Sequence, residues 1–169
     1  MKELCIVRHA KSDWAEEFLN DIDRQLSPRG LNDAYFMSDW FSKNKTAPDL
    51  ILTSTATRAL STALIFARKF KLDDNQVKLE PKIYEADVST LLTIIQSQPN
   101  TVQRIMLFGH NPGLSNLCNT LSDDLFFDNL PTCALSSFLF TVKSWKEIAP
   151  KKGKLNYYEF PKNFKNYDR

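Results

Sequence analysis

Short apolar runs alternate along this chain with segments whose apolar residues recur at helical spacing. The runs predict strands over residues 3–8, 48–54, 77–81, 103–110, 135–142 and 154–161. The helical spacing predicts helices over residues 27–44, 57–70, 89–98 and 112–123. Because strands alternate with helices, the pattern predicts an α/β fold, a three-layer α/β/α sandwich around a mostly parallel central sheet.

Several helix starts carry local signals. Ser27 suits the N-cap of the first helix and Pro28 its first position, although Gly30 in the same turn weakens that helix slightly. Ser89 or a neighbour is expected to cap the third helix, and Pro112 to begin the fourth. The remaining polar stretches predict a loop over 11–27, a lysine-rich turn over 149–154 and a C-terminal tail over 162–169.

Composition fits one globular domain over residues 1–169. Hydrophobic residues make up 43% and charged residues 25% of the chain, and the net charge of +2 is too small to favour a nucleic-acid partner. No run approaches the ~18 apolar residues of a membrane span, and the N-terminus has no signal-peptide pattern. A cytoplasmic protein without membrane contact is expected, and a monomer, since no coiled coil is predicted.

Candidate chemistry lies where the predicted strands end. Arg8 and His9 end the first strand, and His110 ends the strand over 103–110. Arg58 falls in the first turns of the helix that follows the second strand. Ligands of such sheets bind beyond the carboxyl ends of the strands. If these strands are neighbours, one sheet edge holds both histidines of the chain and two guanidinium groups.

These groups suit a phosphoryl group. Guanidinium binds phosphate oxygens in bidentate fashion, helix N-termini add backbone donors, and neutral imidazole is a nucleophile towards phosphorus. Taken singly, a strand-end histidine fits a structural role, and Arg58 fits a solvated helix face. Together they predict a phosphoryl site at which a histidine accepts the group covalently.

The sequence lacks the residue patterns that other kinds of catalytic or binding site require. Cys5, Cys118 and Cys133 lie among apolar neighbours and suggest buried side chains, not a disulfide framework or a zinc site. None has an arginine at the Cys-x5-Arg spacing of a cysteine phosphatase. No glycine-rich nucleotide loop is present, and no His, Asp and Glu spacing suggests a metal site. Neither a metal nor a cofactor is therefore expected.

Five motifs occur in order over about residues 3–142. They read "IVRHAKS", "DRQLSPRG", "STATRALSTA", "IYEA" and "LFGHNPGLSNL". Together they resemble the histidine phosphatase superfamily, and most closely its small SixA-type phosphohistidine phosphatases. The resemblance implies a phosphoglycerate mutase-like form of the predicted fold. It also implies that His9 is the nucleophile, that Arg8 and Arg58 bind phosphate oxygens, and that His110 stabilises the transition state.

The resemblance also implies roles for further residues, some of which have alternative interpretations. Arg24 matches an arginine near the phosphate in SixA-type members. Glu85 resembles the general acid of the broader family, with Asp87 as the local alternative and helix capping as the structural one. Ala10 stands where the commonest motif has glycine. Because alanine adopts a positive φ only at a cost, the geometry of this loop stays open.

The short segments between the motifs limit the kinds of substrate that we expect. They predict a small cap and an open cleft, which suits a phosphoryl group on a protein surface, most simply phosphohistidine. A phosphatase of small monoesters, such as sugar or nucleotide phosphates, is the alternative. A phosphate-binding module without turnover is a further alternative, and the presence of His9 argues against it.

Overall fold

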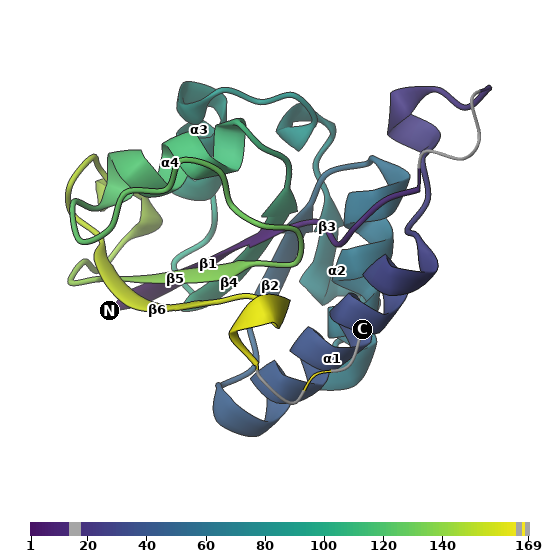
Figure 1. Ribbon diagram of the computed structural model, residues 1–169. Coiled ribbons are helices and arrows are strands. Elements are labelled where there is room, and N and C mark those ends of the chain that lie inside the picture. The colour runs from purple at the N-terminus through teal and green to yellow at the C-terminus, as the bar shows by residue number, and fades with distance from the viewer. Residues whose placement is uncertain (14–17, 165–166, 168–169) are drawn as a thin grey trace.

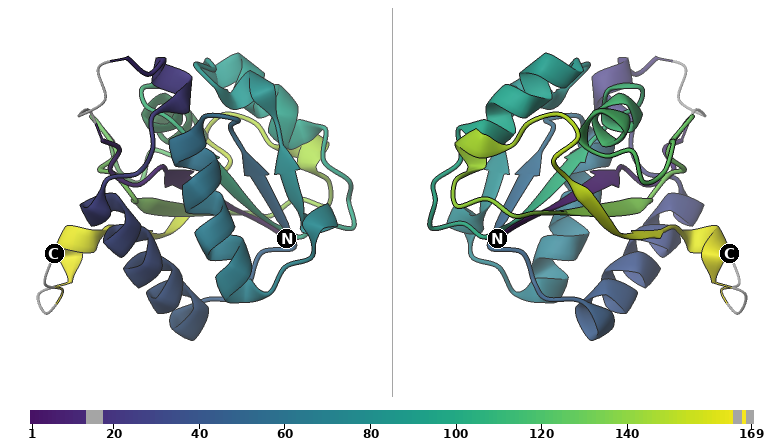
Figure 2. Two further views of the ribbon diagram at one scale, coloured as in Figure 1. Left: turned by 90° about the vertical axis from the view of Figure 1, so that its right-hand side faces the viewer. Right: turned by 90° about the vertical axis from the view of Figure 1, so that its left-hand side faces the viewer.

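The computed structural model describes residues 1–13, 18–164 and 167. In this part of the chain, one mixed sheet is covered by helices on both faces (Figures 1 and 2). The strands are β1 (Lys2–Arg8), β2 (Leu50–Thr53), β3 (Val77–Leu79), β4 (Arg104–Gly109), β5 (Leu135–Phe140) and β6 (Lys154–Glu159). The α-helices are α1 (Pro28–Asn44), α2 (Thr57–Phe70), α3 (Val88–Gln96) and α4 (Gly113–Leu121).

The order of strands in the sheet is β3-β2-β4-β1-β5-β6. The first four strands of this order pair in parallel, whereas β5 is antiparallel to both β1 and β6. The predicted three-layer sandwich with a mostly parallel sheet is therefore confirmed. Since β2, β4 and β1 are direct neighbours, their carboxyl ends meet at one edge.

Alternating side chains of β1 build two cores. Leu4 and Ile6 face the core under α3 and α4, whereas Cys5 and Val7 face the core under α1 and α2. Both faces are buried, as expected for a strand inside a parallel sheet. The helix pairs thus hold β1 from opposite sides and fix the direction in which its last residues leave the sheet (Figure 1).

The predicted elements are present, with ends that differ by one or two residues at most termini. Ser27 caps α1 as predicted, since its Oγ accepts from Gly30 N at 3.0 Å. The cap of α3 is Asp87 and not Ser89, since Asp87 Oδ1 accepts from Thr90 N at 2.8 Å.

Gly30 has a packing reason to lie inside α1. A Cβ at this position would be 2.0 Å from the carbonyl oxygen of Lys11. The backbone of Ser27 donates to the same oxygen at 2.9 Å. Glycine therefore lets the start of α1 approach the segment that follows His9, and this gain outweighs its poor helix propensity.

The predicted loop and tail carry more structure than expected. Residues 14–17 of the loop lie outside the described residues, but its remainder contains a short 3-10 turn, Asp21–Asp23. At the other terminus, the rings of Phe164 and Tyr167 lie 5.1 and 3.9 Å from the ring of Phe36 on α1. The described part of 162–169 therefore packs on α1 and is not a free tail.

Two further expectations can be compared with the structure. All three cysteines are buried and free, as their apolar neighbours predict. No helix within the described residues combines the length and the apolar character needed to cross a bilayer.

Candidate active site

Strand register places the two histidines side by side. Arg8 of β1 pairs with Gly109 of β4, so His9 and His110 follow matched positions on adjacent parallel strands. The backbone of His9 donates to the carbonyl of Gly109 at 3.1 Å, and the two imidazole centroids lie 5.2 Å apart. The sheet, and not a loop, therefore sets the distance between the rings.

His9 is held as a neutral ring. Its side chain is buried, and its Nδ1 lies 2.7 Å from the carbonyl oxygen of Ala10. Because a carbonyl can only accept, Nδ1 carries the hydrogen and Nε2 keeps its lone pair. Burial, with the charges of His110 and Arg58, lowers the pKa of His9 to about 3. At neutral pH, Nε2 is therefore available as a nucleophile.

Ala10 adopts its place without strain. It does not lie in the left-handed region, where the described non-glycine residues are Lys71, Glu85, Cys133 and Lys151. Its N–H donates to Thr62 Oγ1 at 3.1 Å, and its side chain is fully buried. The alanine in place of the common glycine thus leaves the geometry around His9 intact.

Arg58 bridges His9 and an aspartate. Its Nε donates to His9 Nε2 at 3.3 Å. On its other side, Nη1 donates to the carbonyl oxygen of Asp21 at 2.5 Å and Nη2 donates to Asp21 Oδ2 at 2.9 Å. Asp21 therefore holds the guanidinium from behind while Nε points at the nucleophile.

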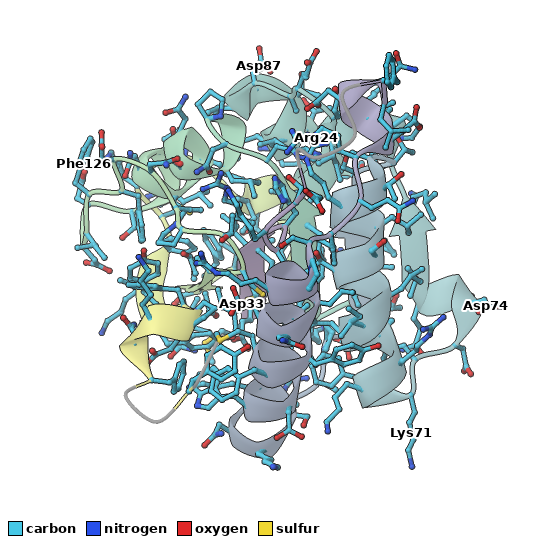
Figure 3. All side chains as sticks on the ribbon, turned by 45° about the vertical axis from the view of Figure 1, so that its right-hand side comes forward. Arg24, Asp33, Lys71, Asp74, Asp87 and Phe126 are labelled. Atoms are coloured by element: carbon cyan, nitrogen blue, oxygen red, sulfur yellow. The ribbon has the colours of Figure 1, made fainter. Side chains whose placement is uncertain are left out.

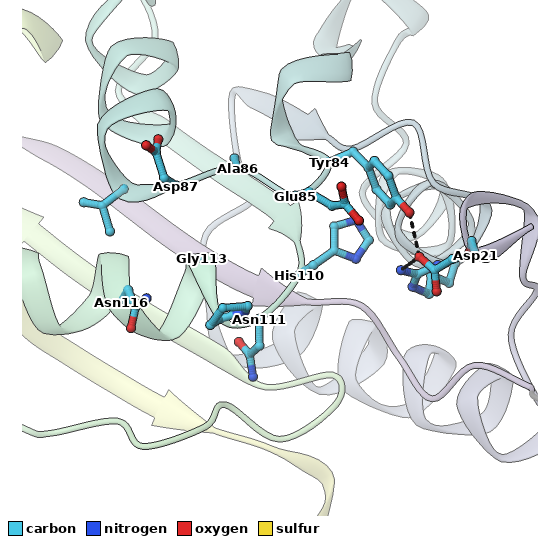
Figure 4. A pocket seen from close by; sticks show the side chains of 12 residues that line it. Asp21, Tyr84, Glu85, Ala86, Asp87, His110, Asn111, Gly113 and Asn116 are labelled. Atoms are coloured by element: carbon cyan, nitrogen blue, oxygen red, sulfur yellow. Dashed lines mark hydrogen bonds and ion pairs between the residues drawn. The ribbon is translucent and has the colours of Figure 1, made fainter.

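Asp21 joins three segments of the chain. Its carboxylate also accepts from Arg24 Nη1 at 2.9 Å. It accepts from the hydroxyl of Tyr84 at 2.7 Å as well (Figure 4). The hydrogen bonds from Tyr84, Arg58 and Arg24 hold the pKa of Asp21 below its usual range, and Asp21 raises the pKa of Tyr84. The sequence does not predict this role, because nothing in the spacing separates Asp21 from Asp23 in the same loop.

Arg8 and Arg24 complete the cationic group. Arg8 Nη1 donates to Leu130 O at 2.5 Å, and its Nε is a buried atom without a hydrogen-bond partner among the described residues. Arg24 Nη2 donates to Ser12 Oγ at 2.5 Å. Arg24 is thus linked to Arg58 through the shared carboxylate of Asp21.

His110 faces His9 across the site. Its Nε2 lies 2.9 Å from Ser54 Oγ, and its Nδ1 is buried without a partner among the described residues. The ring of Tyr84 stands edge-on at 5.5 Å. Burial and the charge of Arg58 lower the pKa of His110 to about 4. His110 is therefore neutral near pH 7 before a ligand arrives.

A pocket of about 680 Å³ opens beside these groups. Glu85 and His110 both point into it, whereas the Asp87 carboxylate caps α3 at its rim (Figure 4). A Cβ on Gly113 would be 2.3 Å from the carbonyl oxygen of Ala86, so α4 packs closely on this wall. The structure thus brings all six predicted residues to one edge of the sheet: Arg8, His9, Arg24, Arg58, Glu85 and His110. Within the described residues, no group of three or more His, Cys, Asp or Glu side chains could hold a metal ion.

Comparison with known families agrees with this fold. Residues 4–110 match the family model of the histidine phosphatase superfamily (branch 1). The chain therefore belongs to the histidine phosphatase superfamily, which supports phosphatase activity.

Three similar proteins cover nearly the same span. An uncharacterized chloroplastic protein of Arabidopsis thaliana, At3g52155, is 30% identical over 86% of this chain and 70% of its own length. The crystal structure of SixA from Agrobacterium tumefaciens is 27% identical, with a TM-score of 0.78 over 95% of this chain and 99% of that chain. The protein histidine phosphatase SixA complexed with tungstate has a TM-score of 0.81 over 95% and 98%, at 20% identity.

Replacing Asp21 by alanine should lower kcat/KM for p-nitrophenyl phosphate about 10- to 100-fold, because Arg58 loses the partner that aims its Nε at His9. The matched control is Asp23→Ala in the same turn, whose carboxylate bonds to Asn20. Steady-state rates of the two variants and the parent make the comparison. Unchanged or faster turnover by Asp21→Ala would show that Asp21 does not position Arg58.

Both histidine rings should stay neutral far below the pH at which histidine ordinarily titrates. Their pKa values are lowered in the folded protein, so protonation favours the unfolded chain, and stability falls as pH drops below about 6.5. Ring-nitrogen NMR spectra of the ligand-free protein, recorded from pH 8 to the onset of acid unfolding, should show no titration midpoint above pH 5. A midpoint near 6.5 for His9 would contradict the burial argument.

Proposed function

We propose that this protein is a phosphatase that forms a covalent phosphohistidine on His9, and that its substrate is phosphohistidine carried by a protein. The observation that supports it most is the unprotonated Nε2 of His9, 3.3 Å from Arg58 Nε at the edge of a rigid sheet. A nucleophile with its lone pair facing a guanidinium is arranged for attack on a phosphoryl group that the guanidinium binds.

In the first step, His9 Nε2 attacks phosphorus in line with the leaving group. A P–N bond forms, and the bond from phosphorus to the leaving atom breaks with its electron pair on that atom. Arg58 Nε, Arg8 Nε and His110 Nδ1 are the donors proposed for the phosphoryl oxygens. Arg8 Nε and His110 Nδ1 are buried nitrogens without a hydrogen-bond partner among the described residues. A phosphoryl oxygen would supply the acceptor that each of them lacks.

In the second step, water attacks the phosphorus of the phosphohistidine. The P–N bond breaks, its electron pair returns to Nε2, and inorganic phosphate leaves. His9 retains its Nδ1 hydrogen and its bond to Ala10 throughout, so the same tautomer serves both steps. Water is the only co-reactant that this sequence consumes.

The proposed proton donor is Glu85. Its side chain lines the pocket with His110, whereas Asp87 uses Oδ1 to cap α3. An alkoxide leaves slowly unless it receives a proton, but the imidazole of phosphohistidine is a better leaving group and needs less help. The demand on Glu85 therefore depends on the substrate.

A protein substrate is supported by the likeness to SixA over nearly the whole chain and by a pocket that opens to the surface. Small phosphate monoesters also fit a volume of about 680 Å³ and are the competing substrates. A phosphohistidine protein should be turned over with higher kcat/KM than sugar or nucleotide phosphates. The reverse order would contradict the protein substrate and leave the covalent chemistry in place.

Replacing His9 by alanine should abolish turnover, with a loss of more than about 10³-fold in kcat. After rapid quenching with a ³²P-labelled substrate, the parent protein should carry an acid-labile, base-stable label that the variant lacks. Thermal unfolding of both proteins checks that the fold is retained. Full activity of His9→Ala, or a label that persists on it, would exclude the covalent mechanism.

Replacing Glu85 by glutamine should slow alkyl phosphates about 10²- to 10⁴-fold and leave p-nitrophenyl phosphate nearly unchanged, since p-nitrophenolate leaves without a proton. Glu80→Gln is the matched control, because the half-buried Glu80 carboxylate caps the turn ahead of α3 and lies outside this pocket. An equal loss on both kinds of ester would assign Glu85 another role.

A further inference from the structure

The pocket beside His9 has two electrostatically different halves. Its inner half holds Arg58, Asp21 and His110, and Glu85 lies beside the His110 ring (Figure 4). Its outer half, towards the start of α3, is lined by Asp87. Within the described residues, Arg58 is the only lysine or arginine on its lining. A phosphoryl group bound at His9 would direct its carrier, the leaving group, towards the outer half.

The charges of the inner half match one phosphoryl group. Three guanidiniums, from Arg8, Arg24 and Arg58, and one carboxylate, from Asp21, leave a net charge of two positive units. Asp21 is engaged by two of those guanidiniums and by Tyr84, so its negative charge is compensated locally. A phosphoryl dianion neutralises what remains, and within the described residues no further lysine or arginine lines this pocket to bind a second anionic group.

The carboxylate of the outer half has no such compensation, since Asp87 forms no ion pair with a described residue. The hydrogen bonds from Thr90 lower the pKa of Asp87 and keep it ionised. Glu85, as the proposed proton donor, adds no fixed charge to this wall. The segment that carries Asp87 is also fixed in place, since α4 packs on Ala86 at Gly113 and Asp87 is bound to the first turn of α3.

We propose that this pocket selects phosphoryl groups whose carriers are neutral or cationic near the phosphate, and rejects carriers that bear a carboxylate or a second phosphate there. The proposal rests on the proposed phosphatase function and adds the charge class of its substrate. A fixed negative wall costs an anionic carrier Coulomb energy that a cationic carrier gains. In a protein substrate, lysine or arginine beside the phosphorylated residue would fit this wall.

Phosphoethanolamine and O-phosphoserine test the selection, because they differ by one carboxylate. The parent protein should show kcat/KM about tenfold or more higher for phosphoethanolamine, and salt should narrow the ratio. Asp87→Asn should reduce the ratio several-fold, since asparagine still caps α3 but carries no charge. The control is Asp74→Asn, in the turn before β3 and well away from Asp87 (Figure 3), which should leave the ratio unchanged.

Binding gives a readout that does not need turnover. Calorimetric titration of His9→Ala should show tighter binding of phosphoethanolamine than of O-phosphoserine. Equal affinities, or tighter binding of O-phosphoserine, would overturn the charge selection. The same holds for a ratio of kcat/KM that does not respond to Asp87→Asn.

The two proposals fail in different ways. If the parent protein forms the label on His9 but shows no preference between the two esters, charge selection is wrong and the phosphatase function stands. If His9→Ala binds with the expected preference but the parent protein never forms the label, the covalent phosphatase function is wrong and charge selection stands. Phosphohistidine peptides flanked by lysine or by glutamate extend the test, and preference for the glutamate peptide would contradict it.

Discussion

The parallel register between β1 and β4 is the constraint on which the site depends. It pairs Arg8 with Gly109, so His9 and His110 follow matched positions at the ends of two adjacent strands. Two rings that differ by about a hundred positions in the sequence could not be held 5.2 Å apart by loops alone without a large ordering cost. Of the helices, α2 contributes Arg58 to the site, and together the helices bury both faces of β1 and prevent a slip of the register that would turn His9 away.

The site brings several positive charges close together in a buried place, and Asp21 reduces the repulsion between them. Arg8, Arg24 and Arg58 lie at one sheet edge together with two histidines whose pKa values are strongly lowered. A carboxylate bound to two of these guanidiniums reduces their mutual repulsion and orients them at the same time. Since Asp21 approaches Arg58 from the side away from His9, it stabilises the cations without occupying the edge that faces the nucleophile.

Periodicity in the sequence locates the site residues that regular structure places, whereas the site residues in loops either come only from the family resemblance, as Arg24 and Glu85 do, or are missed. Arg8, His9 and His110 follow apolar strands, and Arg58 lies in the start of a helix, so strand and helix periodicity locates them. Asp21 and Tyr84 sit in irregular segments whose path depends on contacts with distant parts of the chain, and no local pattern marks them. The same reason explains why Phe164 packs on α1 although composition alone suggests a tail.

The contrast between strand ends and loops also separates the proposed nucleophile from the residue proposed to select the substrate. His9, which would form and break the bond to phosphorus, follows a strand end, where burial and register leave it little freedom. The carboxylate of Asp87, proposed to face the carrier, stands on the segment before α3, which also carries the proposed proton donor Glu85. A few contacts fix this segment: the close approach of Ala86 to Gly113, the cap at Asp87 and the left-handed backbone of Glu85. Changing the charge on this segment alters neither the register nor the state of His9. The outer wall can therefore vary between proteins of this fold while the centre at His9 stays the same, and the charge of that wall is the feature of this chain that bears most directly on its substrate.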